Sequence, residues 1–202
     1  MSSRAVIDVS HLSPSAVDTR GMLWWGNALM LTIEGTVLAL LVAVYFYLRF
    51  WLPVWPPPGA GRPPLGWGAL NLLLLAVSAI PMHLADKAAE HEDRHGVQVW
   101  LIVGSILGLA FLAGQILIWR SFTFDYASHA YGSIVFTLFG LHCMHVVVCL
   151  GEVAVLLVLS FLPDDFHDEQ RLGVVTSGLY WNFVLGTWVV LYLVLFVGPR
   201  VL

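Results

Sequence analysis

The segment FGLHCMHVVVCLGE, residues 139–152, places two histidines, two cysteines and a glutamate in an otherwise apolar stretch. Successive residues of a helix are about 100° apart, so His142, His145 and Glu152 would lie within about 80° of one another on one face. Cys149 falls on the same face. Side chains of these types can ligate a metal, ligate haem, pass protons or hydrogen-bond neighbouring helices. Which of these applies depends on the elements around the stripe.

A second polar stripe lies in residues 24–50, where Asn27, Glu34 and Tyr45 fall within about 40° on one helical face. Glu34 and Glu152 are each about ten residues from the end of their apolar stretches, so antiparallel helices would hold the two carboxyls at similar depth. Burial disfavours a charged carboxyl, so at least one should be protonated near pH 7. If the two helices pack together, Glu152 or His145 is the candidate partner of Glu34. Proton handling and purely structural hydrogen bonding both remain open. The polar residues expected to be buried in the helix bundle are Asn27, Tyr45, His83, His142 and His145.

A metal or haem site would need ligands beyond this stripe. A histidine pair three residues apart completes a metal site only with further ligands, and haem would need His83 to face His142 or His145 across two helices. The two cysteines are six residues apart on one helix, which suits small buried packing residues better than a disulfide. We therefore expect no haem, copper or iron on this chain. The competing hypotheses are a stand-alone membrane redox protein using these three histidines and a proton-coupled transporter using the two glutamates.

The elements that must position these residues are membrane helices. Hydrophobic residues make up 59% of the 202 residues and charged residues only 11%, which excludes a soluble globule with a polar surface. A spanning helix needs about 20 mostly apolar residues. The chain is therefore predicted to be all-α, a single transmembrane domain over 1–202. The five predicted spans cover about 24–50, 68–85, 97–119, 130–161 and 172–197. Residues 1–22 are expected to form a polar N-terminal arm rather than a cleaved signal peptide.

Two connectors have a clear character. Residues 51–68, rich in proline and glycine, predict a stiff non-helical link, and residues 86–96 predict a polar loop. Five spans place the termini on opposite sides of the membrane, and ten of the thirteen acidic residues fall in the loops on the N-terminal side. Carboxylates interleaved with histidines can collect protons, since imidazole generally titrates near neutral pH. The candidates are His91, Glu92, Asp93 and His95. The alternative is an ordinary solvated loop, and the acidity argues against a nucleic-acid partner.

Four stretches, in order, resemble subunit III of the haem-copper oxidases in its short five-helix bacterial form. Glu34 in LTIEGTVLALLVAVYFYLR resembles the buried glutamate of the first helix shared by that family. WPPPG followed by Asn71 is similar to its Trp-Pro-Pro loop. AYGSIVFTLFGLHCMHVVV resembles its Tyr-Gly-Ser and His-x-x-His signature, and YWNFVLGTW its last helix. The likeness runs from about residue 24 to residue 197.

The chain also departs from that family. Asn182 and Leu185 stand where the family usually has histidine and aspartate, and Ile118 where a glutamate commonly occurs. His83 is the single member of a usual histidine pair, and Glu152 replaces an apolar residue. Roles tied to the terminal-helix histidine and aspartate do not carry over. An accessory subunit of a nitric oxide reductase is the nearest competing interpretation.

The resemblance implies a non-catalytic lateral subunit in a complex that reduces oxygen to water and translocates protons. Its main contact would be subunit I, with subunit II and other oxidase subunits as further partners. Haem and copper would lie in those partners, with phospholipid bound between the helices of this chain. Candidate lipid contacts are Arg20, Arg49, Arg62 and Trp55. The bacterial inner membrane is the expected location, with the N-terminus cytoplasmic and the C-terminus periplasmic; cytochrome c and quinol both remain possible electron donors.

Overall fold

The computed structural model describes residues 21–162 and 168–201, so Arg20 and nearly all of the expected polar arm lie outside the described residues. All regular structure in this part of the chain is helical. The helices are α1 Met22–Trp51, α2 Leu65–Glu90, α3 Arg94–Arg120, α4 Ala130–Phe161 and α5 Asp168–Tyr192, followed by the π-helical turn η1 Leu193–Val197 and by α6 Gly198–Val201. Five of them are long and apolar enough to cross a membrane. The all-α, five-span prediction is confirmed.

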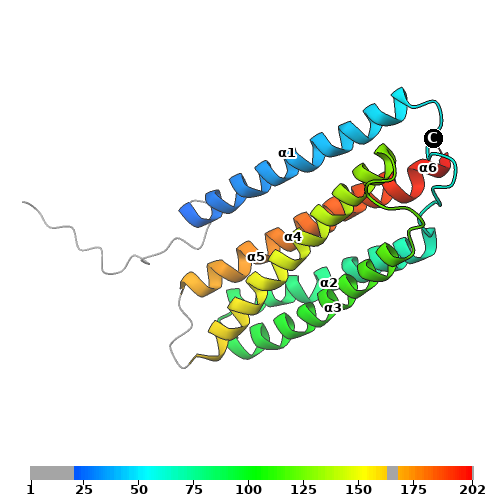
Figure 1. Cartoon of the computed structure of the whole chain (residues 1–202). Coiled ribbons are helices and arrows are strands. Elements are labelled where there is room, and N and C mark those ends of the chain that lie inside the picture. The colour runs from blue at the N-terminus through cyan, green and yellow to red at the C-terminus, as the bar shows by residue number, and fades with distance from the viewer. Residues whose placement is uncertain (1–20, 163–167, 202) are drawn as a thin grey trace, which may run out of the picture.

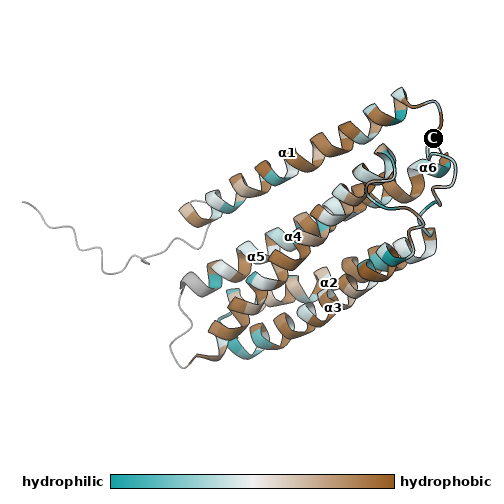
Figure 2. Cartoon of the chain, in the orientation of Figure 1, coloured by the Kyte–Doolittle hydropathy of each residue, from teal (hydrophilic) through white to brown (hydrophobic). Residues whose placement is uncertain are grey.

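The five spanning helices run side by side, with α4 and α5 between α1 on one side and α2 and α3 on the other (Figure 1). Helix α1 packs chiefly against α4 and α5, whereas α2 packs extensively against α3 and also against α5. Hydrophobic residues surround the helices along most of their length, and polar residues gather toward the ends (Figure 2). A helix that is apolar on its outer face as well as its inner face is suited to lipid rather than water.

The second polar connector is shorter than the sequence predicts. Helix α2 continues to Glu90 and α3 begins at Arg94, which leaves only residues 91–93 of the expected loop 86–96 outside a helix. Asp93 caps α3, since its Oδ1 accepts a hydrogen bond of 3.0 Å from the amide of Gly96. The prediction was wrong here because hydropathy marks the apolar window, while a helix can extend through charged residues beyond it.

Close approach of helices shapes the centre of the bundle. A Cβ atom built on Gly108 of α3 would lie 2.6 Å from the Trp181 ring of α5, and one on Gly114 would lie 2.1 Å from Oδ1 of Asn71 on α2. Both positions therefore have room only for hydrogen. Trp181 in turn donates its indole N–H to the hydroxyl of Ser78 over 3.0 Å. Small residues that let backbones approach are typical of membrane helix contacts, where lipid supplies no hydrophobic driving force.

Candidate functional site

Glu34 of α1 meets His145 of α4 inside the bundle. The distance from Glu34 Oε2 to His145 Nε2 is 3.5 Å, which is within ion-pairing range. The histidine is 6% exposed and the carboxyl side chain is only partly exposed. Packing of the first span against the fourth, which the sequence could only assume, is confirmed, and of the two candidate partners of Glu34 it is His145 that lies within ion-pairing distance.

His142 lies one turn away and faces a different neighbour. It is fully buried, and its Nε2 lies 3.1 Å from the backbone carbonyl of Val184 on α5. A carbonyl oxygen only accepts, so this nitrogen carries the hydrogen and donates it. The ring packs against Trp188 at 4.9 Å and Phe111 at 5.9 Å between centroids. His142 is thus held by its surroundings, and no described residue pairs with it as a partner of opposite charge.

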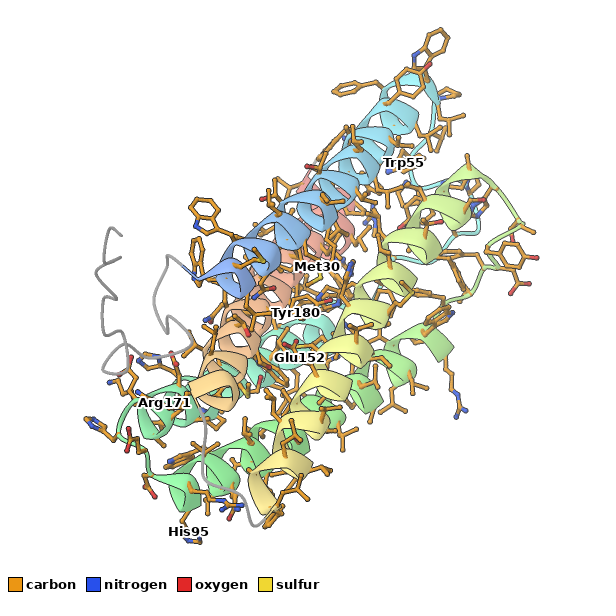
Figure 3. All side chains as sticks on the ribbon, turned by 90° about the vertical axis from the view of Figure 1, so that its left-hand side faces the viewer. Met30, Trp55, His95, Glu152, Arg171 and Tyr180 are labelled. Atoms are coloured by element: carbon orange, nitrogen blue, oxygen red, sulfur yellow. The ribbon has the colours of Figure 1, made fainter. Side chains whose placement is uncertain are left out.

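Tyr180 of α5 joins the cluster around Glu34, and it interacts electrostatically with both Glu34 and Glu152. Glu152 lines a hollow of about 560 Å³ with Asn27, Met30 and Thr176. Met30, Tyr180 and Glu152 lie in the middle part of the molecule, between the two ends of the bundle (Figure 3).

The expectation of similar depth for the two carboxyls is corrected by these contacts. Glu34 lies level with His145, and Glu152 lies seven residues, or about 10 Å, further along α4 toward the end that carries Arg171 and His95. The estimate from the sequence measured depth from the ends of the apolar runs. Both helices have nearly the predicted bounds, so the difference comes from their stagger: Glu34 is 12 residues from the start of α1, whereas His145, which lies level with it, is 16 residues from the end of α4.

The stripe predicted on the first span faces the bundle along its whole length. Asn27 donates from Nδ2 to the carbonyl of Thr176 over 2.9 Å, and Tyr45 is fully buried. The hydroxyl of Tyr45 accepts a hydrogen bond of 3.1 Å from Trp55 Nε1, and the Trp55 ring packs edge-on against Tyr131 at 4.8 Å. Trp55 therefore uses its indole N–H within the protein, which argues against its expected role as a lipid contact.

His83 is not among the buried polar residues, contrary to the prediction. Its side chain is exposed on α2, where it lines a small hollow with Asp86 and Asn182. The contacts of His142 and His145 are with α1, α3 and α5, so the three histidines do not face one another as a haem site would require. Among the described residues, no three side chains of His, Cys, Asp or Glu are grouped as a metal ion would need. Both cysteines are free thiols.

The proton-collecting candidates of the loop between α2 and α3 and the start of α3 divide into two kinds, carboxylates with local partners and exposed histidines. Glu92 accepts a hydrogen bond of 3.3 Å from Arg171 of α5, and Asp93 caps α3, so both carboxylates have local structural roles. His91 and His95 are exposed at this end of the bundle, and Figure 3 shows His95 and Arg171 together there. The opposite end carries the remaining lipid candidates: Arg49 lies near Tyr45, and Arg62 is exposed near Tyr131.

Several contributing residues were not identified from the sequence. Arg171 donates from Nε to the carbonyl of Ala89 over 3.0 Å, and Arg94 donates from Nε to that of Ser160 over 2.6 Å, so each arginine serves the last turn of another helix. A cation at a helix C-terminus is favourable, but only tertiary structure shows which helix receives it. Tyr180 had a local signal, since Thr176 and Tyr180 are four apart and give α5 a polar face.

Comparison with known proteins gives consistent results. A family model described as cytochrome c oxidase subunit III matches residues 25–198. Over 172 residues the chain is 28% identical to cytochrome c oxidase subunit 3 of Synechocystis sp., covering 85% of this chain and 74% of that protein. It is 25% identical over 175 residues to the subunit 3 of Thermostichus vulcanus, covering 87% of each chain. It is 29% identical over 187 residues to a probable subunit 3 of Mycobacterium tuberculosis, covering 91% of this chain and 88% of that one.

Proposed function

The chain belongs to the cytochrome c oxidase subunit III family, and we propose that it packs against subunit I of its oxidase and there supports proton uptake, lipid binding and stability of the complex. Membership makes it a non-catalytic subunit of a haem-copper terminal oxidase in a respiratory chain. The observation that carries this function is the family match over residues 25–198, together with five spanning helices. The nitric oxide reductase, stand-alone redox and transporter hypotheses are not favoured.

The proposal extends to partners and cofactors. Subunit I is the main contact, subunit II and other oxidase subunits are further partners, and haem and copper belong to them. His142 supports this assignment, because its Nε2 is used by the carbonyl of Val184 and its ring is enclosed by aromatic side chains. The membrane is the bacterial inner membrane, with the N-terminus cytoplasmic, in keeping with a slight excess of cations on that side.

Purification through a tag on this chain tests the assignment. We expect haem-containing subunits to copurify, and the chain expressed alone to show no stoichiometric Soret band and no bound copper or iron. A haem or metal content near one per isolated chain would overturn the proposal in favour of a redox protein. The electron donor follows from the same preparation, by comparing oxidation of cytochrome c with oxidation of a quinol.

Proton uptake is assigned to the exposed histidines at the end that carries the loop 91–93. His91→Gln combined with His95→Gln removes both imidazoles and leaves the Glu92 and Asp93 contacts intact. Oxygen consumption of the complex should then fall most at high pH, where free protons are scarce, across a range of about pH 6 to 9. Thr123→Ser, at an exposed residue, serves as a control for the handling of variants. Equal pH profiles for wild type and the double variant would leave this loop as an ordinary solvated connector.

A further inference from the structure

The hollow beside Glu152 reaches the end of the bundle where α1 and α5 begin. It measures about 560 Å³, and we call it the Glu152 hollow; its lining residues are Met22, Leu23, Gly26, Asn27, Met30, Glu152 and Thr176. Met22 is the first residue of α1, and Figure 3 shows Arg171 and His95 at the same end. An ionisable side chain in a membrane span generally faces protein or a water-filled cavity. The hollow is far larger than the about 30 Å³ that one water occupies, and Glu152 and Asn27 line it with polar groups, so it can hold water.

Tyr180 lies deeper in the bundle than this hollow. Helices α1 and α5 run in the same direction here, because Asn27 donates to the carbonyl of Thr176, and a Cβ built on Gly35 would lie 3.4 Å from the Phe183 ring. Tyr180 is four residues beyond Thr176 and three before Phe183. It therefore lies about 6 Å along α5 from the first contact, which is level with the hollow, and about 4.5 Å from the second, which is level with Glu34.

The hydroxyl of Tyr180 can link two carboxyls. It is buried, and it interacts electrostatically with Glu34, Cys149 and Glu152, which lie on α1 and α4. Neither this hydroxyl nor Oε2 of Glu34 has a well-formed hydrogen bond among the described residues. His145 faces Glu34 on the far side, with 3.5 Å between Nε2 and Oε2. Because a phenol can accept a hydrogen bond and donate its own hydrogen, Tyr180 has the chemistry of a proton-transferring link.

We propose that Glu152, Tyr180 and the pair formed by Glu34 and His145 are a proton relay, which loads this pair from water in the Glu152 hollow. The proposal deepens the proton-uptake role above and rests on it. Glu152 gives its carboxyl proton to the Tyr180 oxygen while the Tyr180 O–H proton passes to the Glu34 carboxylate. Glu152 then regains a proton from water. The pair gains one proton, held on the carboxyl or on the imidazole, and no bond between heavy atoms changes.

Hydrogen–deuterium exchange of the Glu34 carboxyl in the intact oxidase tests this relay. The protonated-carboxyl infrared band that Glu34→Gln removes is followed after a switch to D2O, at several values from about pH 5 to 8. Tyr180→Phe keeps the ring and removes the link, and Glu152→Gln keeps the shape and removes the acid. Each should slow the exchange about 100-fold, the lower end of what a positioned proton-transfer group generally contributes. Exchange at the wild-type rate in either variant would overturn the relay, as would the absence of a Glu34 band throughout this range.

Two glycines test the hollow as the entry. Gly26→Leu fills it without meeting protein atoms, since a Cβ built there meets none within 4 Å, and should slow the exchange. Gly66→Leu, at an equally open glycine near the start of α2 at the opposite end, should not. Glu90→Gln, at an exposed carboxyl near the end of α2, should also leave the exchange unchanged. Equal rates for the two leucine variants would overturn the proposal.

Assembly and turnover are measured on the same samples. An assembled, active complex whose Glu34 carboxyl exchanges equally fast in all variants refutes the relay alone. Failure of the wild-type chain to copurify with haem subunits would refute the proposed function.

Discussion

Two regions of the molecule are built differently. One is the inner bundle, formed by helices α2 to α5, and the other is the α1 seam, the contacts of α1 with α4 and α5. In the inner bundle, Gly108 and Trp181 pack so closely that only hydrogen fits on the glycine, and His142 is fully enclosed. The α1 seam depends on separate polar contacts, at Asn27 and at Glu34. Only 11% of the most apolar window of α1 is buried in the chain, against 44% for the helix from Arg171 to Val201.

This difference shows how one histidine motif serves two purposes. His142 and His145 are one turn apart on α4. His142 hydrogen-bonds to the carbonyl of Val184 on α5, within the inner bundle, whereas His145 lies beside the carboxyl of Glu34 on α1. Where helices pack closely, a side chain of the wrong size is directly destabilising. A polar contact between membrane helices, in contrast, contributes only about 0.6 kcal/mol on average. We therefore expect substitutions in the inner bundle to lower the stability of the complex more than substitutions in the α1 seam.

The largest effect is expected for Gly108→Val. Its Cβ would lie 2.6 Å from the Trp181 ring and 2.9 Å from Leu150, and overpacking of this kind costs about 1–3 kcal/mol or more. The Tm of the purified complex and the yield of the chain should both fall. Gly151→Val is the matched control, since a Cβ at that glycine on α4 meets no atom within 4 Å. Equal losses for the two variants would contradict close packing at Gly108.

A second comparison uses the two histidines directly. His142→Ala removes a buried ring and its hydrogen bond to the carbonyl of Val184, which keeps a side-chain donor in the Thr187 hydroxyl, so we expect a loss of about 2 kcal/mol. His145→Ala, in the α1 seam, should cost about half as much, because α1 can settle against lipid. Thermal unfolding of the assembled complex measures both. If His145→Ala proves the more damaging, the seam contributes more stability than the inner bundle at this level.

The same contrast explains what the sequence could and could not predict. Apolar length and helical periodicity identified all five spans and the stripe of Asn27, Glu34 and Tyr45, because membrane burial imposes both patterns on the chain. The partners of Glu34 and His142 depend on which helices touch and on their stagger, which no local pattern records. The burial of His83 was predicted wrongly for the same reason. The contact of Arg171 could not be predicted either, because its carbonyl partner on α2 is 82 residues away.

The third prediction concerns Glu34 as an acid or as a hydrogen-bonding group. Glu34→Gln keeps the shape and the hydrogen-bonding capacity, whereas Glu34→Ala leaves His145 without its partner at a cost of about 1–3 kcal/mol. The Tm of the complex should survive the first change and fall with the second. If Glu34 is protonated, infrared difference spectra should lose a protonated-carboxyl band in both variants. Equal damage by the two substitutions would mean that Glu34 must act as an acid, and the proton-handling role would then replace the structural one.

The smallest effect is expected at Asn27. It tests whether the contacts of the α1 seam contribute to stability additively or whether one contact dominates. Asn27 donates to the carbonyl of Thr176 over 2.9 Å, but that carbonyl can also accept within its own helix, so Asn27→Ala removes one bond without leaving a costly orphan. We expect a loss of about 0.6 kcal/mol. Thr32→Val is the control, because the Thr32 hydroxyl bonds only to Ala28 of the same helix on an exposed face. Asn27 and Glu34 are two turns apart with separate partners, so Asn27→Ala combined with Glu34→Ala should lower stability by the sum of the two losses. A combined loss well beyond that sum would show that α1 detaches from α4 and α5 as a unit, and the contrast with the inner bundle would then be one of cooperativity as well as strength.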